Sequence, residues 1–417
     1  MSSQADPEPL RVLVLGGGVA GVECLLGLHD LAGDRVDVTL LSEARDLHYR
    51  PLAVGEPFGG EHAQRYELAE LAEQCGARFV HGVARHVAVK GHVVKTLAGD
   101  VLSYDVLVVA LGTVPHLSYG RALAFDVTTK EMLSRTLNRV LRGEVRRLVV
   151  ALPPGPHWTL PGYELALLLA HAAAPADFEV VLVTAERAPL EVFGREATAA
   201  VTGELASAGV QLVCDTRIAL SGSAPTTVAM TPSGETYDAD LVIALPSLHA
   251  PTMSGLPTLA SGFLKVDEHG RVSGAQDVYA AGDCTDFPIK QGGLAAQQAD
   301  VVVEHLAERA GATVESDPHA HILRARMVTG SGDLWLRRDL GDLADPGTVA
   351  HRALWWPPGK IAGRWLAPYV AARADGQAGV PHAPAHGGAV ELAGEAADVP
   401  GPRHLDRLGD PPRVDGR

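Results

Sequence analysis

A glycine-rich turn near the N-terminus constrains the fold of this 417-residue chain more than any other feature. The apolar run Arg11–Leu15 is typical of a buried parallel strand, and Gly16–Gly21 follow it directly. A helical stretch continues from Val22 to Leu28, and a second apolar run, Val36–Leu41, ends shortly before Glu43. The order of strand, glycine turn, helix and strand predicts a βαβ unit of about 30 residues.

The spacing within this unit is suited to a dinucleotide. Gly16 and Gly18 allow a tight turn and a close approach to a pyrophosphate, and Gly21 allows close packing of helix on strand. Glu43 lies 22 residues after Gly21, where an acid accepts hydrogen bonds from an adenosine ribose. The start of the helix offers free main-chain N–H groups, which belong to Gly18, Val19, Ala20 and Gly21. The alternative is a glycine-rich turn in an ordinary α/β domain.

The chain contains an internal repeat of this kind of unit. The segment Tyr104–Thr113 has a near-copy at Tyr237–Pro246, and each copy closes an α/β unit. The elements expected for the second unit are a strand at Arg146–Leu152, a helix at Tyr163–Ala172 and a strand at Phe178–Val183. The chain is therefore predicted to hold two Rossmann-like domains.

Composition and charge exclude several classes of protein. Hydrophobic residues make up 47% of the chain and charged residues 20%, which is typical of a globular protein and not of a disordered one. The net charge of −15 argues against nucleic-acid binding, which requires a basic surface. Neither a secretory signal nor an apolar run long enough for a transmembrane helix is visible, so a cytoplasmic location is expected. The 18 histidines show no metal-ligand spacing, and no metal is predicted.

The ordered motifs resemble those of two-dinucleotide-domain flavoproteins of the glutathione-reductase superfamily. The resemblance covers roughly residues 1–310 and includes Ala110-Leu-Gly112 and Ala281-Gly-Asp283. Within that superfamily, the segment 48–58 resembles the aromatic and proline segment of type II NADH dehydrogenases and sulfide:quinone oxidoreductases. Lys290-Gln-Gly292 resembles the Lys-x-Gly of the latter group, and Ala295–Gln298 resembles the glutamine-bearing helix of the former.

The resemblance implies an α/β fold with two Rossmann-like, glutathione-reductase-like domains, a small C-terminal α+β domain and FAD as cofactor. The implied FAD-binding domain comprises residues 1–116 and 262–317, and a second, degenerate NAD-like domain spans 117–261. A C-terminal or interface domain is expected at 318–373. A disordered tail is expected at 374–417, because that stretch is rich in glycine and proline.

The resemblance also assigns roles to residues at the cofactor. Asp283 would bind the ribityl chain or the pyrophosphate, and Lys290 or the helix that begins near Gly292 would stabilise the reduced flavin. Glu164 is the candidate for the nicotinamide side of the flavin, with a helix N-terminal carboxylate as the alternative. Further cofactor-binding candidates, besides the residues of the first turn and Glu43, are Arg50, Ala110, Gly112 and Gly282.

Two departures from the family pattern bear on the electron donor. The chain has no cysteine in the segment 153–164 and none after Cys284, so oxidation of sulfide through reactive thiols is disfavoured. The loop before Gly162 carries Pro153, Pro154, Pro156 and Pro161, and prolines lack the N–H donors that bind a pyrophosphate. NAD(P)H therefore remains one of two alternatives for the donor.

Aromatic residues near the C-terminus suggest a membrane contact. Trp355, Trp356 and Trp365 lie among basic residues, a combination that suits a bilayer interface on the inner face of a membrane. The alternatives are that these aromatics pack over the flavin or form a homodimer contact. His157 and Trp158 are candidates for a substrate lid, and His48, Tyr49 and Arg50 for the substrate side of the flavin.

The sequence leaves three functional hypotheses. The first is an FAD-dependent oxidoreductase of NAD(P)H:quinone type, in which a small donor and a small acceptor react in turn with the flavin. The second is an oxidoreductase with a non-nicotinamide donor, similar to a sulfide:quinone reductase but without its cysteines. The third is a non-catalytic FAD-binding module that senses redox state.

Overall fold

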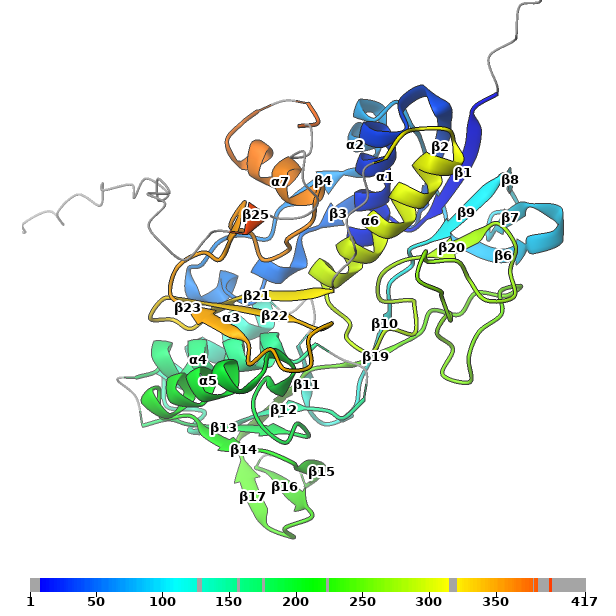
Figure 1. Cartoon of the computed structure of the whole chain (residues 1–417). Coiled ribbons are helices and arrows are strands. Elements are labelled where there is room, and N and C mark those ends of the chain that lie inside the picture. Colours follow the sequence, from blue (N-terminus) through cyan, green and yellow to red (C-terminus); the bar gives the residue numbers. More distant parts are fainter. Residues whose placement is uncertain are drawn as a thin grey trace, which may run out of the picture.

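The structure is a computed structural model that describes residues 8–125, 130–155, 158–174, 177–222, 225–314, 321–377, 379–381 and 390–391. Its first unit is a five-stranded parallel sheet in the order β20-β9-β1-β2-β5 (Figure 1). The strands of this sheet are β1 (Leu10–Leu15), β2 (Val36–Ser42), β5 (Arg78–His81), β9 (Val106–Val109) and β20 (Val278–Ala280).

Alternating apolar residues give this sheet two buried faces. Val12 and Val14 face one core, in which α1 packs beside α6, and Leu13 and Leu15 face a second core under a three-stranded meander (Figure 1). The helices of the unit are α1 (Val19–Leu31), α2 (Leu68–Gln74) and α6 (Gly292–Arg309). The strands of the meander are β6 (Ala84–Ala88), β7 (Val93–Thr96) and β8 (Val101–Ser103).

The second unit repeats this plan. Its parallel sheet has the order β11-β18-β12-β13-β14, with helices on one face and another antiparallel meander on the other (Figure 1). The sheet strands are β11 (Leu123–Ala124), β12 (Arg147–Leu152), β13 (Glu179–Thr184), β14 (Gln211–Val213) and β18 (Leu241–Ala244). The helices and meander strands are α3 (Lys130–Leu141), α4 (Leu160–Ala172), α5 (Arg195–Ser207), β15 (Arg217–Ser221), β16 (Thr226–Thr231) and β17 (Thr236–Ala239).

The two units are joined by a pair of short antiparallel strands. The chain leaves the first unit through β10 (Val114–His116) and returns through β19 (Ser247–His249), and these strands pair with each other. The imidazole rings of His116 and His249 stack there with their centroids 4.7 Å apart. The first unit is therefore split in sequence, and its last strand and helix come after the whole second unit.

The C-terminal part adds a small antiparallel sheet and one helix. The sheet packs against helices of the second unit, while α7 (Leu366–Ala374) packs on the helix side of the first unit (Figure 1). The strands of this sheet are β21 (Ile322–Val328), β22 (Asp333–Asp339) and β23 (Thr348–Ala350), and β24 (Trp355–Trp356) pairs separately with β25 (Val390–Glu391). Shorter elements are β3 (Asp46–His48), β4 (Arg65–Glu67) and the 3-10 turns η1 (Gly33–Arg35), η2 (Arg50–Leu52), η3 (Glu56–Phe58), η4 (Val89–Gly91) and η5 (Glu191–Phe193).

The predicted fold class is confirmed: the chain has two Rossmann-like units and a small C-terminal α+β part. The predicted domain boundaries remain a prediction, although the strands of the two parallel sheets fall within the predicted ranges, whereas β25 lies within the predicted tail. The predicted disordered tail at 374–417 lies mostly outside the described residues, as does His157 of the predicted lid.

Candidate functional site

The first glycine turn is tightly folded against the neighbouring strand. Gly16 has φ +109°, and a Cβ atom there would lie 2.3 Å from the carbonyl oxygen of Ala110. A Cβ at Gly21 would lie 1.8 Å from the carbonyl oxygen of Gly16, so this helix position must be glycine. Around Gly18, in contrast, no atom lies within 4 Å of a built Cβ. The turn is thus closed on its inner side and open outside Gly18.

The open side of the turn presents unused hydrogen-bonding groups. The N-cap of α1 is Gly18, which has no side chain to cap the N–H groups of the first helical turn. Glu43 follows β2 and is exposed, and only its main-chain carbonyl takes part in a hydrogen bond that the described residues make, with His81. An anion at the helix start and a hydroxyl-bearing group at Glu43 would both find partners here.

The carboxyl ends of β9 and β20 lie on the same side of the sheet as the first glycine turn, which follows the carboxyl end of β1. Gly112 has φ +64° with open space around it, and Gly282 has φ +82°. A Cβ at Gly282 would lie 3.0 Å from Cβ of Ala20, so the chain passes close to the start of α1. Asp283 follows at once, and burial raises its pKa to about 6, against the opposing effect of Lys290.

Hydrogen bonds formed by Gln298 and Lys290 fix the loop that leads from β20 into α6. The side-chain oxygen of Gln298 in α6 accepts from the Gly282 N–H at 2.9 Å and from the Thr285 hydroxyl at 3.0 Å. Lys290 is buried, donates to the carbonyl of Thr285 at 2.7 Å and lies 3.9 Å from the centre of the Phe263 ring. Burial lowers the pKa of Lys290. These contacts fix the loop between β20 and α6.

The C-terminal loop 357–361 covers the start of α6. A Cβ at Gly292 would lie 3.0 Å from Cδ1 of Ile361. The main-chain N–H of Ile361 donates to the hydroxyl of buried Tyr49 at 2.9 Å. Arg50, the next residue, is exposed at the start of η2. The segment around His48 therefore supports the C-terminal loop through Tyr49.

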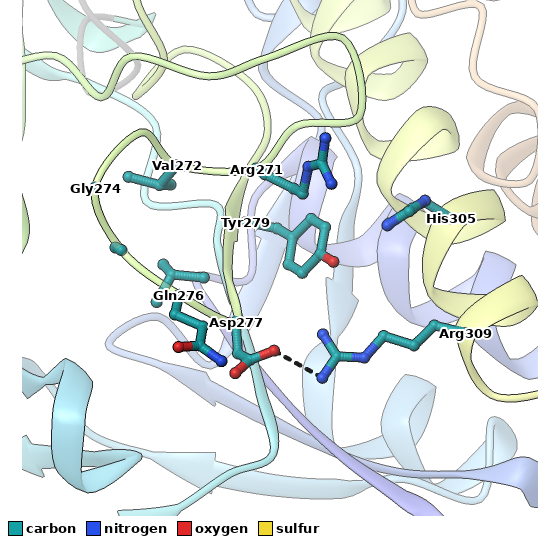
Figure 2. Close-up of a pocket in the computed structure, with 10 residues that line it drawn as sticks. Arg271, Val272, Gly274, Gln276, Asp277, Tyr279, His305 and Arg309 are labelled. Carbon is teal, nitrogen blue, oxygen red and sulfur yellow. Dashed lines mark ion pairs between the residues drawn. The ribbon is translucent and has the colours of Figure 1, made fainter.

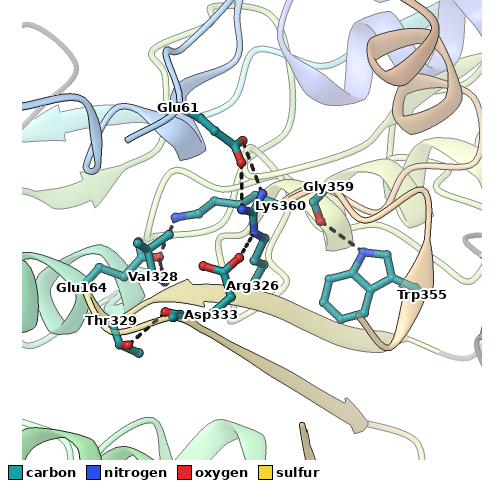
Figure 3. Close-up of polar contacts among 10 residues, drawn as sticks. Glu61, Glu164, Arg326, Val328, Thr329, Asp333, Trp355, Gly359 and Lys360 are labelled. Atoms are coloured by element: carbon teal, nitrogen blue, oxygen red, sulfur yellow. Dashed lines mark hydrogen bonds and ion pairs between the residues drawn. The ribbon is translucent and has the colours of Figure 1, made fainter. Parts of the chain in front are cut away.

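Glu164 lies in a buried ion pair that the sequence did not reveal. Its Oε1 accepts from the ammonium of Lys360 at 2.5 Å and from the main-chain N–H of Val328 at 2.8 Å, and both charged groups are buried (Figure 3). Burial raises the pKa of Glu164, and the ammonium of Lys360 acts in the opposite direction. The pair ties α4 of the second unit to the C-terminal loop.

A second set of charges surrounds this pair. Arg326 donates to Asp333 at 2.6 Å and to Glu61 at 2.8 Å, so β21, β22 and the loop after η3 meet here (Figure 3). Trp355 donates its indole N–H to the carbonyl of Gly359 at 3.1 Å in the same region. Sequence spacing could not have found Lys360 or Arg326, because no motif surrounds either of them.

Two of the three tryptophans predicted to contact a membrane are inside the protein. Trp355 is fully buried and lies 4.6 Å from the ring of Trp335, and Trp365 is 1% exposed and donates to Asp30 at 2.9 Å. Only Trp356 is exposed, at 45%. The expectation of a bilayer contact through Trp355 and Trp365 is corrected accordingly: both complete the core. No helix among the described residues is long and apolar enough to span a bilayer.

An open cavity of about 650 Å³ lies at the amino ends of the strands of the first sheet. It is lined by Tyr279, His305, Asp277 and Arg309, near the beginning of β20 and the end of α6 (Figure 2). Arg309 forms an ion pair with Asp277 at 2.7 Å. Ligands of open parallel sheets bind at the carboxyl ends of the strands, and this cavity is at the opposite end. The glycine turns, and not this cavity, form the candidate site.

The fold and the glycine turns define a protein built of two Rossmann-like units. A family model for pyridine nucleotide-disulphide oxidoreductases matches residues 10–300, and the chain belongs to this family. The predicted superfamily is therefore confirmed, and membership makes the chain an oxidoreductase by family. No curated protein matches the chain.

Solved structures with this fold include three oxidoreductases. The sulfide:quinone oxidoreductase of Aquifex aeolicus superposes with a TM-score of 0.72 at 18% identity, covering 82% of this chain and 87% of that one. A NAD-dependent persulfide reductase from A. fulgidus has a TM-score of 0.59 at 20% identity, covering 79% and 64%. A ferredoxin reductase from Rhodopseudomonas palustris has a TM-score of 0.60 at 19% identity, covering 78% and 81%. At these identities the similarity supports the fold.

Proposed function

We propose that the chain is an FAD-dependent oxidoreductase that accepts two electrons from a small donor and passes them through FAD to a quinone-type acceptor. The observation that carries this proposal is the cradle at the carboxyl edge of the first sheet. Gly18 and Gly112 leave open space there, the start of α1 has no capping side chain, and Glu43 is exposed. These residues fit a dinucleotide, because each offers room or a hydrogen-bonding group that the protein itself does not use.

Each residue of the cradle would bind a different part of FAD. The first-turn N–H groups of α1 suit the pyrophosphate, and Glu43 suits the adenosine ribose. Asp283 would accept hydrogen bonds from hydroxyl groups of the cofactor, and Gly292 begins a helix whose positive end favours a negative charge. FAD, when bound, supplies the two-electron chemistry. The family roles of Glu164, Lys290 and Arg50 remain predictions.

Reactive thiols do not support a sulfide-oxidising mechanism in this chain. Cys24, Cys75 and Cys284 are buried. Burial raises the pKa of Cys284 to about 11 and that of Cys75 to about 12, so neither forms a thiolate at neutral pH. A quinone-type acceptor is favoured by the similarity to the Aquifex aeolicus enzyme across most of both chains. Docking on the inner face of a membrane would have to use exposed residues such as Trp356. Formation of a homodimer remains a prediction.

The proposal is tested by a reduction and reoxidation experiment on the purified protein. The flavin band near ~450 nm should be present, and it should bleach on anaerobic photoreduction. Addition of a water-soluble quinone should restore the band within seconds, whereas buffer alone should not. Absence of a flavin band contradicts the cofactor. A reduced flavin that persists with quinone supports the redox-sensing alternative and contradicts a quinone oxidoreductase.

A further inference from the structure

The second unit contains a counterpart of Glu43 that can be located from strand register. In the first unit Leu15 pairs with Leu41, and Glu43 lies two residues after Leu41. In the second unit Leu152 pairs with Thr184, and the residue two positions after Thr184 is Glu186. Glu186 therefore stands where the acid of a dinucleotide-binding unit accepts hydrogen bonds from a ribose.

The carboxylate of Glu186 is already used by the protein. It accepts hydrogen bonds from the hydroxyl of Tyr163 at 2.7 Å, from Thr184 at 3.1 Å and from Thr159 at 3.2 Å. Two of these donors come from the start of α4, which in such units faces the nucleotide. Three protein hydroxyl groups thus occupy the acid that two ribose hydroxyl groups would require. Glu43, whose side chain has no such partners among the described residues, shows the opposite arrangement.

The loop before α4 also differs from the first glycine turn. Gly162 is the third residue of α4, as Gly21 is of α1, and a Cβ there would lie 2.2 Å from the side chain of Leu152, so both glycines serve the packing of helix on strand. The loop between β12 and α4 is longer than the first turn, and its Trp158 packs on the core with its ring 5.9 Å from that of Phe193. Thr159 takes the N-cap position that Gly18 holds in α1.

We infer that Glu186, Tyr163 and Thr159 form an internal lock that excludes pyridine nucleotides from the second unit. The electron donor is then a small reductant without an adenosine moiety, which reaches the flavin without binding to the second unit. This inference rests on the proposed function for the presence of a flavin, but exclusion of the nucleotide is a property of the second unit alone. It selects the non-nicotinamide alternative among the donors that the sequence left open.

Calorimetric titration of the full-length protein with NADH and then NADPH tests the exclusion. No binding is expected at nucleotide concentrations up to about 1 mM, the upper end of ordinary KM values. The flavin band of the same sample should stay unbleached. Binding with a Kd below about 0.1 mM, abolished by Glu186→Ala, would overturn the inference. Because the Glu186→Ala control assigns any heat of binding to the second unit, this result does not depend on whether the proposed cofactor is present.

A pair of matched variants tests whether the hydrogen bonds to Glu186 form the lock. Glu186→Ala leaves the buried Tyr163 hydroxyl without its acceptor, so the unfolding midpoint of the flavin-free chain should fall by about 3 °C or more. Glu43→Ala, at the corresponding position of the first unit, should leave that midpoint nearly unchanged and instead weaken FAD binding at least tenfold. Equal midpoints for the two variants would show that Glu186 is not locked and would overturn the inference.

Discussion

Asp283 lies between the end of β20 and the start of α6, and its carboxyl group titrates near physiological pH. Burial raises its pKa to about 6, and the charge of Lys290 and the main-chain N–H of Gln291 only partly oppose this effect. A carboxyl group with a raised pKa holds its proton more tightly in the folded protein than in the unfolded chain. An aspartate would serve the hydroxyl groups of a cofactor best when ionised, and burial makes this ionised form unfavourable in the flavin-free protein.

The pH dependence of stability follows from this shift. The contribution of Asp283 is complete below the unfolded pKa of about 4 and is lost as pH rises through about 6. Asp283→Asn cannot lose a proton, so the flavin-free variant should gain stability relative to the wild type between pH 4 and 6 and keep that gain above it. Urea unfolding of both proteins from pH 4 to 8 measures the difference. A difference that is constant over the whole range would contradict the prediction.

At the level of elements, the two glycines that flank the first turn of α1 have different tasks. The built Cβ of Gly21 collides with a main-chain oxygen at 1.8 Å, whereas that of Gly18 meets nothing within 4 Å. Gly21 is required by the packing of helix on strand, and Gly18 leaves room for a ligand. Glycine in this motif therefore meets a packing requirement at position 21 and a ligand-binding requirement at position 18.

Alanine substitutions separate these two tasks. Gly21→Ala should destabilise the flavin-free protein, because the main chain must move to make room for the Cβ atom. The loss should reach about 3 kcal/mol or more, the upper end of the usual range of about 0.5–3 kcal/mol for single mutations. Gly18→Ala should cost less than about 1 kcal/mol as an N-cap change, yet reduce FAD affinity at least tenfold. Urea unfolding and flavin titration measure the two effects. Loss of stability in Gly18→Ala comparable to that in Gly21→Ala would contradict this division.

The C-terminal helix shows how a local signal can mislead about an element. Tryptophans among basic residues suggested an exposed amphipathic segment, but Glu23 of α1 accepts the main-chain N–H groups of Trp365 and Leu366, each at 2.8 Å. Arg364 is buried as well and donates to Glu304 of α6 at 2.7 Å. The segment is bound to α1 and α6 by buried acids far away in sequence, which composition alone could not reveal.

At the scale of the whole molecule, the Glu164–Lys360 pair joins the second unit to the C-terminal loop. Lys360→Met should leave the carboxylate of Glu164 buried without its counter-charge and lower the free energy of unfolding by about 3–5 kcal/mol. The double variant Glu164→Gln with Lys360→Met should recover most of that loss. Denaturant unfolding of the four proteins in this cycle measures the coupling.

An exposed pair on α3 provides the control for this cycle. Arg135 and Glu131 lie 3.8 Å apart with side chains more than 80% exposed, so Arg135→Met should cost less than about 1 kcal/mol. Equal losses for Lys360→Met and Arg135→Met, or full additivity of the Glu164 and Lys360 variants, would show that the buried pair does not join the two parts of the molecule.

The sequence by itself determined the two sheets, the first glycine turn and the family. Buried parallel strands are continuous apolar runs, and the glycine positions are local steric requirements, so both are readable from neighbouring residues. Only the tertiary structure decided that Glu186 is bonded to Tyr163, that Glu164 is paired with Lys360 and that Trp355 and Trp365 are buried. These contacts join residues from separate elements, 196 positions apart in the case of Glu164 and Lys360, and no local pattern specifies which distant side chain will satisfy a buried charge or hydroxyl.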